Sequence, residues 1–238
     1  MERAQARGLS RSRIARLLSV ASDELSIGAR ISLLSNELLG YPYSPNPLIG
    51  SAETAEVFTA SLDGFDCVTF IETVLALARS FDIDGFVAAL RRVRYDGGCV
   101  RWERRNHYMT SWIRNNAREG IVRPIATRDL PMVVRERVLN VVSGLAAQRI
   151  RIRCAPKSAM PRLMRRLKTG DLIFFASTRA NLDVFHAGII VRDGATVSLR
   201  HASRGQGRAV EQDLRGFLKA NRMAGVIVAR PREIQRRR

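Results

Sequence analysis

The residues best suited to catalysis in this sequence are one cysteine and two histidines. The stretch GFDCVTFIETVLALARS, residues 64–80, places Cys67 directly after Asp66 and before a long apolar run. Asp66 is a favourable N-cap, so we predict a helix from Cys67 to about Ser80. A helix N-terminus lowers the pKa of a thiol and offers backbone N–H groups to a developing oxyanion. Cys67 is therefore a candidate nucleophile.

The two histidines stand in the second half of the chain, in DVFHAGIIV (His186) and VSLRHAS (His201). Both segments belong to a series of short stretches that are rich in Val, Ile and Phe and separated by turn residues, which predicts strands. If the strands are neighbours, the two imidazoles lie side by side. A cysteine at a helix start and a histidine on a strand can form a nucleophile–base pair, and a further polar group such as His201 can orient the base.

Each of these residues also has a purely structural interpretation. A buried cysteine on an apolar helix is commonly inert. A strand histidine can be a satisfied core or edge residue, and Asp66 can serve as a helix cap alone. Residue types and spacing therefore leave both interpretations open.

The first half of the chain is predicted to be mostly helical. Residues 1–39 keep helical spacing, the loop GYPYSPNPLIGS (residues 40–51) interrupts them, and the cysteine helix follows. Further helices are predicted at residues 84–94, from about Asn106 through HYMTSWIRNN, and at residues 129–148.

The pattern changes after Pro161. GDLIFFAS, DVFHAGIIVR, ATVSLRHAS and AGVIVARP are short, rich in Val, Ile and Phe, and separated by turn residues. Helices followed by strands predict an α+β fold, with helices packed on an antiparallel sheet.

Composition limits the class of protein. The 238 residues carry a net charge of +18, and only Lys157, Lys168 and Lys219 are lysines. This charge suits a nucleic acid or another anionic polymer. However, the arginines are scattered, as expected for solvated surfaces in a chain from a GC-rich genome, and RPREIQRRR at the end is the clearest basic tail. We therefore expect only weak attraction to anionic polymers, not nucleic-acid binding.

No apolar run reaches about 18 residues, so we predict no membrane-spanning helix. The Arg-rich N-terminus lacks the pattern of a secretion signal. We expect a cytoplasmic protein, or a periplasmic one if the N-terminus is incomplete. The three cysteines, Cys67, Cys99 and Cys154, have no C-x-x-C spacing, which argues against a structural zinc site.

Several motifs in order resemble NlpC-type cell-wall cysteine hydrolases, a papain-like superfamily. They are GYPYSPN, GFDCVTFIE, GDLIFF, HAGIIV and HAS. Within that superfamily, FDCVTFIETVLALAR, NHYMTSWI and LDVFHAGI resemble the N-acetylmuramoyl-L-alanine amidase-like family. The resemblance covers about residues 30–231. It departs from the family at Ala187, where H-V-G becomes H-A-G, and at Asn106 in RRNHY.

The resemblance implies roles for particular residues. Cys67 would be the nucleophile, His186 the general base and then the acid, and His201 the group that orients it. Tyr43 matches a tyrosine beside the nucleophile. Asp66 and Asp183 match positions that line the substrate pocket, although capping and turn formation explain them equally well. No cofactor and no metal ion are implied.

The resemblance also implies a papain-like core with an inserted helical subdomain at about residues 81–160. We divide the chain into a basic helical extension (1–29), a hydrolase domain (30–231) and a basic tail (232–238). In the insertion, Tyr108 and Trp112 could offer flat surfaces to a sugar ring, and His107 could bind the sugar by a hydrogen bond. Trp112 could equally anchor its helix to the core.

The expected activity is hydrolysis of peptidoglycan fragments through a thioester acyl-enzyme. The bond implied by the resemblance joins N-acetylmuramoyl (or anhydromuramoyl) to L-alanine. An endopeptidase that cuts within the stem peptide is the close alternative. A basic nucleic-acid-binding protein without catalysis is the alternative from another class.

Overall fold

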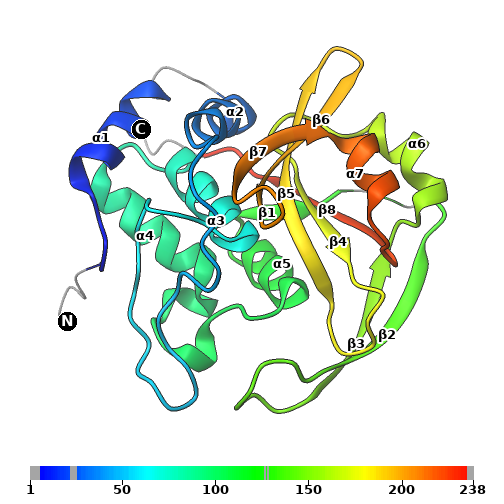
Figure 1. Cartoon of the computed structure of the whole chain (residues 1–238), viewed down its shortest axis with the longest axis horizontal. Coiled ribbons are helices and arrows are strands. Elements are labelled where there is room, and N and C mark those ends of the chain that lie inside the picture. The colour runs from blue at the N-terminus through cyan, green and yellow to red at the C-terminus, as the bar shows by residue number, and fades with distance from the viewer. Residues whose placement is uncertain (1–5, 22–25, 126, 128, 235–238) are drawn as a thin grey trace.

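The structure is a computed structural model, and it describes residues 6–21, 26–125, 127 and 129–234. Its elements are shown in Figure 1. The helices are α1 (Arg11–Val20), α2 (Ile27–Glu37), α3 (Cys67–Ala78), α4 (Ile83–Arg94), α5 (Met109–Arg118), α6 (Met160–Met164) and α7 (Leu214–Ala220). The strands are β1 (Val122–Pro124), β2 (Val133–Leu139), β3 (Gln148–Cys154), β4 (Leu172–Ala176), β5 (Val184–Asp193), β6 (Thr196–Ser203), β7 (Arg208–Asp213) and β8 (Gly225–Pro231).

Six strands form one antiparallel sheet in the order β1-β8-β4-β5-β6-β7. Helices α1 to α5 lie on one side of this sheet and α6 and α7 on the other (Figure 1). The predicted α+β fold, with helices on an antiparallel sheet, is therefore confirmed. The strands that contain His186 and His201 are neighbours in the sheet, as predicted.

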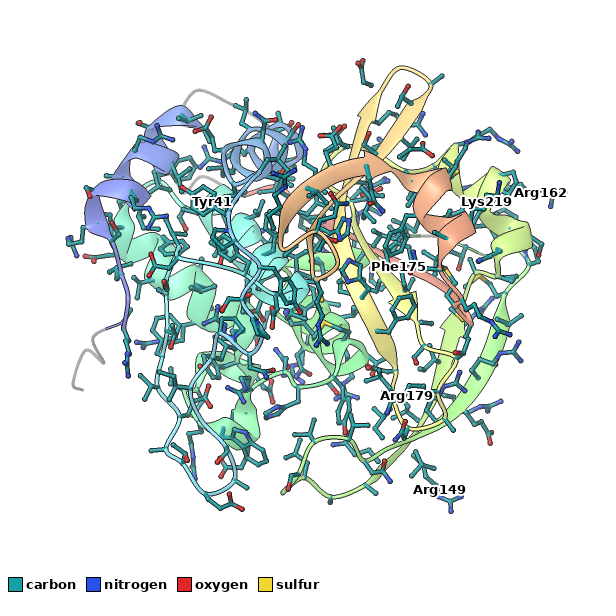
Figure 2. The ribbon with its side chains drawn as sticks, viewed as in Figure 1. Tyr41, Arg149, Arg162, Phe175, Arg179 and Lys219 are labelled. Atoms are coloured by element: carbon teal, nitrogen blue, oxygen red, sulfur yellow. The ribbon has the colours of Figure 1, made fainter. Side chains whose placement is uncertain are left out.

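Alternating side chains of β4 separate two apolar cores. Leu172 and Phe174 pack with helices α1 to α5, whereas Ile173 and Phe175 pack with α6 and α7. Figure 2 shows Phe175 in the interior on the α7 side. The sheet is thus buried on both faces, which fixes the strands that carry the two histidines.

Helix α3 begins at Cys67 because the Asp66 side chain accepts hydrogen bonds from the backbone N–H groups of Val68 and Thr69. The Thr69 hydroxyl in turn accepts from the Asp66 N–H, which completes a capping box. Every residue of α3 from Thr69 to Ala78 is buried. The predicted cysteine helix is confirmed, and its burial holds Cys67 in place.

The predicted helix at residues 129–148 is wrong. Residues 133–154 instead form an antiparallel ribbon, in which Val133 pairs with Cys154 and Leu139 with Gln148. The segment is rich in β-branched valine and isoleucine, and QRIRIRC alternates polar and apolar residues. This period of two suits a ribbon that packs one face on the sheet, through Ile152 and Cys154. The insertion at residues 81–160 therefore contains α4 and α5 but is not entirely helical.

The predicted N-terminal extension packs into the main core, because Ile14, Leu17 and Leu18 of α1 are buried there. The boundary predicted at residue 30 falls inside α2. The basic tail is described only as far as Ile234, and residues 235–238 lie outside the described residues. Within the part of the chain that the structure describes, no helix is long and apolar enough to cross a membrane.

Some of the basic side chains stabilise the fold. Buried or half-buried arginines bind backbone carbonyls or carboxylates inside the molecule; they include Arg30, Arg94, Arg105, Arg192, Arg200 and Arg230. Others, such as Arg149, Arg162 and Lys219, point outward at the edge of the molecule (Figure 2). The net charge therefore overstates the charge available to an anionic partner.

Candidate active site

The candidate site lies where the β5–β6 ladder ends. These strands pair from Ile189 with Arg200 to Asp193 with Thr196, whereas His201 pairs with β7 instead. Helix α3 packs against both strands at this point. The backbone of Ala187 lies close enough to the Cys67 sulfur to favour its thiolate form, so the thiol sits beside the residue that follows His186.

The two histidines are joined directly. The Nε2 atom of His186 lies 2.7 Å from Nδ1 of His201, and the rings are perpendicular. Phe217 of α7 contacts both rings, at centroid distances of 5.5 Å and 5.6 Å. Gly188 leaves the space beside them, since a Cβ at this position would lie 2.6 Å from Leu199 and 3.2 Å from His201. Side-by-side imidazoles were predicted, and the structure contains them.

The Nε2 atom of His186 is occupied by His201, so its Nδ1 is left for another partner. Among the described residues, Nδ1 makes no hydrogen bond to the Cys67 sulfur. Cys67 and His186 are brought close because the sulfur lies beside the backbone of Ala187, the residue that follows His186. Cys67 and His186 are both half-buried, so a substrate can reach them from solvent.

The charge states differ from the expectation of a lowered thiol pKa. Burial, and then the nearby Asp66 carboxylate, raise the pKa of Cys67 to about 12. The backbone N–H groups at the start of α3 oppose this rise but do not overcome it. Burial, and then the neighbouring His201, lower the pKa of His186 to about 3. At neutral pH the thiol and the imidazole are therefore both uncharged.

Tyr43 lies near the cysteine. Its backbone bridges Phe65, and the N–H of Ser44 donates to the Phe65 carbonyl over 2.9 Å. Burial, then the charges of Cys67 and Asp66, raise the pKa of Tyr43. Tyr43 thus remains a neutral phenol that can donate a hydrogen bond near the sulfur.

Two of the predicted pocket residues act as helix caps in the structure. Asp66 caps α3, as described above. Asp183 is buried, and its Oδ2 accepts from the N–H and the hydroxyl of Thr110 in the first turn of α5, at 2.7 Å and 2.8 Å. Burial raises the pKa of Asp183, and the Thr110 hydrogen bonds oppose that rise. Both Asp183 Oδ atoms bind the protein, so the structure favours the capping interpretation for this residue.

The predicted sugar platform is wrong as stated. Tyr108 and Trp112 are 3% and 0% exposed, so neither ring can stack on a sugar. The Trp112 indole donates to Glu72 inside the core, which is the anchoring role left open above. His107 Nε2 lies 2.7 Å from the Trp102 carbonyl and its ring packs on Trp102, so one ring nitrogen is already engaged. A helix face cannot be identified as exposed from its sequence alone.

A family model matches most of the chain. The N-acetylmuramoyl-L-alanine amidase-like (AmiA-like) model matches residues 33–226, which include Tyr43, Cys67, His186 and His201. The chain belongs to this family. A search of curated proteins found no significant relative.

Solved structures share the fold of this amidase-like protein. A protein from Legionella pneumophila has a TM-score of 0.83 at 19% identity and covers 94% of this chain and 95% of its own. An N-acetylmuramoyl-L-alanine amidase from Bacteroides uniformis has a TM-score of 0.77 at 23% identity and covers 87% and 99%. A putative xylanase from Bacteroides fragilis has a TM-score of 0.71 at 24% identity and covers 82% and 98%. At these identities the likeness concerns the fold.

The structure of the amidase-like chain adds two neighbours that the sequence did not single out. Gln212 of β7 lies beside His201 and raises its pKa, against the larger lowering effect of burial. Arg204, in the turn after β6, lies near Tyr43 and lowers its pKa. Both follow HAS closely in the sequence, but the pairing of β6 with β7 was needed to place them.

No group of three or more potential metal ligands occurs among the described residues of the amidase-like chain. The side chains gathered here are a thiol, two imidazoles and a phenol. This set suits nucleophilic and acid–base chemistry at a carbonyl.

Proposed function

We propose that this amidase-like protein is a cysteine amidase with a papain-like, NlpC-type core. It hydrolyses the amide between the muramoyl (or anhydromuramoyl) lactyl group and L-alanine in peptidoglycan fragments. The observation that carries the proposal is the hydrogen bond between His186 and His201, with Cys67 at the start of α3 beside the backbone of Ala187, the residue after His186. Membership of the amidase-like family supports the reaction class.

The hydrogen bond between the histidines supports the direction of proton transfer. With Nε2–H of His186 donated to Nδ1 of His201, Nδ1 of His186 is unprotonated and can act as a base. It takes the thiol proton as the Cys67 sulfur bonds to the scissile carbonyl carbon. The resulting imidazolium keeps its hydrogen bond to His201, which stabilises the new positive charge.

The remaining steps follow from the same groups. As the tetrahedral intermediate collapses, the carbon–nitrogen bond breaks and His186 gives its proton to the departing amine of L-alanine. A thioester remains on Cys67. His186 then deprotonates a water molecule, which attacks the thioester carbon and releases the muramoyl acid and the free thiol.

The oxyanion has two candidate donors. The backbone N–H groups of Val68 and Thr69 already donate to Asp66, so the N–H of Cys67, which lies beside the sulfur, is the first candidate. The neutral hydroxyl of Tyr43 is the second candidate. Donors aimed at a developing oxyanion typically contribute about 100-fold to 1000-fold each.

The resting state supports general-base catalysis in place of a preformed ion pair. With the thiol pKa near 12 and that of His186 near 3, the thiolate–imidazolium state is disfavoured before substrate binds. The proton therefore moves as the sulfur attacks. A bound substrate excludes water and places its carbonyl oxygen beside the Cys67 N–H. The negative charge then develops on that oxygen during the attack, where the N–H can stabilise it.

Mass spectrometry of reaction products tests the proposal. A muramoyl peptide should release an intact peptide that begins with L-alanine, and the Cys67→Ala variant should release none. The free stem peptide should be a poor substrate, because binding energy from the sugar is then unavailable to the transition state. Internal cleavage of the free peptide at a comparable rate would replace the amidase with the endopeptidase.

A further inference from the structure

The turn between β6 and β7 is fastened to the tyrosine loop of the candidate site. The Tyr43 N–H donates to the Gly207 carbonyl over 2.8 Å, and Pro42 forms a backbone bridge with Arg208. Gly207 has a φ of +65°, and its N–H closes the turn on the Arg204 carbonyl over 3.3 Å. Because Tyr43 itself bridges Phe65, two residues before Cys67, this turn forms one rim of the site.

Arg204 stands out on that rim. Its side chain is exposed, and among the described residues it makes no hydrogen bond, ion pair or ring contact. Many other arginines of the chain bind carbonyls or carboxylates, for example Arg200, which binds Glu211 over 2.6 Å. The positive charge of Arg204 nevertheless acts on Tyr43, which lies beside the Cys67 sulfur. Arg204 is therefore an exposed cation on the rim of the candidate nucleophile site.

We propose that Arg204 binds a carboxylate of the substrate on the peptide side of the scissile bond. The inference rests on the proposed function for the position of that bond. In a muramoyl peptide the lactyl carboxyl is consumed in the amide, so the nearest negative charge belongs to the residue after L-alanine. A planar guanidinium can hold such a carboxylate through two parallel hydrogen bonds. Arg204 thereby selects peptides whose second residue is a free acid over those in which it is an amide.

The expected preference for the acid substrate depends on how far the Arg204 side chain is exposed to solvent. A hydrogen bond to a charged group contributes more than a neutral one, but solvent and salt weaken an exposed pair. We expect roughly a tenfold preference for the acid at low salt, and a smaller preference as salt is added.

Two matched substrates and two matched variants test this inference. The substrates are muramoyl-L-alanyl-D-glutamine, whose single carboxylate is the α-carboxylate of the second residue, and its α-amide, which carries no carboxylate. The variants are Arg204→Gln and, as a control at the first residue of β7, Arg208→Gln, whose side chain is also exposed. In Arg204→Gln, kcat/KM should fall about tenfold for the acid and stay unchanged for the amide. Arg208→Gln should behave as the wild type.

Equal losses on the two substrates would show that Arg204 only supports the turn. No loss on either would show that it does not contact the substrate. Either result would overturn the inference, even if the amidase reaction is observed.

Binding separates this inference from the proposed function. Calorimetry on the Cys67→Ala background should show tighter binding of the acid than of the amide, and Arg204→Gln should abolish that difference. If the wild type cleaves neither substrate but this preference is found, the reaction is wrong and the carboxylate site stands. If both substrates are cleaved and bound equally, the carboxylate site is wrong and the amidase stands.

Discussion

Two buried polar clusters sit on α3, one in its middle and one at its start. In the middle, Glu72 binds Arg94 over 2.7 Å and accepts from the Trp112 indole over 3.2 Å, and Arg94 also donates to the Thr59 carbonyl. At the start, Cys67 contacts Ala187, and His186 is bonded to His201. Burial shifts pKa values in both clusters.

The two clusters differ in whether every buried polar atom has a hydrogen-bond partner. No side-chain nitrogen or oxygen of Glu72, Arg94 or Trp112 is buried without a partner within the described residues. At the start of α3, by contrast, His201 Nε2 is buried and has no hydrogen bond of ordinary length there. A closed cluster of charges holds a fold together, whereas an open cluster of neutral groups can accept and release protons. Their pKa shifts alone would not distinguish them.

The sharpest test of this contrast is Cys67→Ala. We expect hydrolysis of a muramoyl peptide to fall by at least about 10⁴-fold, because the nucleophile of a catalytic unit is lost. The melting temperature should change little, because the capping box of α3 and the hydrogen bond between His186 and His201 stay in place without the sulfur. Residual turnover near the wild-type rate would remove Cys67 from the mechanism.

The opposite result is expected for Glu72→Ala. Removing one partner of a buried ion pair leaves Arg94 uncompensated, so the free energy of unfolding should fall by about 3–5 kcal/mol. Activity per folded molecule should be retained. Glu136→Ala is the control, since Glu136 lies 3.9 Å from Arg151 with both side chains largely exposed, and should cost less than about 1 kcal/mol. Similar losses for the two variants in urea unfolding would contradict the interpretation of the Glu72 cluster.

Thiol reactivity tests the charge state of the open cluster. Because the pKa of Cys67 is raised, its thiolate fraction at pH 7 is small and should grow about tenfold per pH unit. Exposed Cys99 should therefore be alkylated by iodoacetamide before Cys67 at neutral pH. Peptide mass spectrometry at several pH values would show the order. Fastest labelling of Cys67 at pH 7 would indicate a preformed ion pair instead.

Stability should fall in acid because the histidines are buried in their neutral form. The pKa of His186 is lowered from 6.5 to about 3, so between these values the unfolded chain binds a proton that the folded chain does not. Stability is thus full above pH 6.5 and declines as pH falls toward 3, by up to about 1.4 kcal/mol per pH unit for this group. His186→Asn should show a shallower decline in melting temperature. Identical declines in the two proteins would assign the acid sensitivity to other groups.

Much of the fold and of the candidate site could be predicted from the sequence, because the signals were local. The N-cap Asp66 and the apolar run after it predict where α3 begins, and short runs rich in Val, Ile and Phe between turn residues predict β5 and β6. The motif order added Tyr43, which spacing could not connect to Cys67. The structure brings these residues to one place through long-range pairing.

What failed depended on surroundings that the sequence does not encode locally. Residues 133–139 fit a helical pattern of valines, yet they pair with residues 148–154 because the apolar side of a ribbon packs on the sheet. The pKa of Cys67 depends on how deeply α3 is buried, which outweighs the favourable helix start. Tyr108 and Asp183 both carry polar groups, but packing buries the Tyr108 ring and directs the Asp183 carboxylate onto α5.

The smallest expected effect concerns Gln212, the side chain beside the open end of the His201 ring. Gln212 favours the protonated form of His201. It therefore helps to stabilise the positive charge that His186 gains during the attack and that acts on His201 through their hydrogen bond. We expect Gln212→Leu to lower kcat about two- to fivefold with KM unchanged, as for loss of one modest, partly solvated hydrogen bond. The same variant should also shift the pH dependence of kcat. Gln206→Leu is the control, because Gln206 touches Gln212 over 3.5 Å but is exposed in the turn. A change in KM alone, or an equal effect of Gln206→Leu, would show that Gln212 shapes the surface and leaves the histidine pair complete without it.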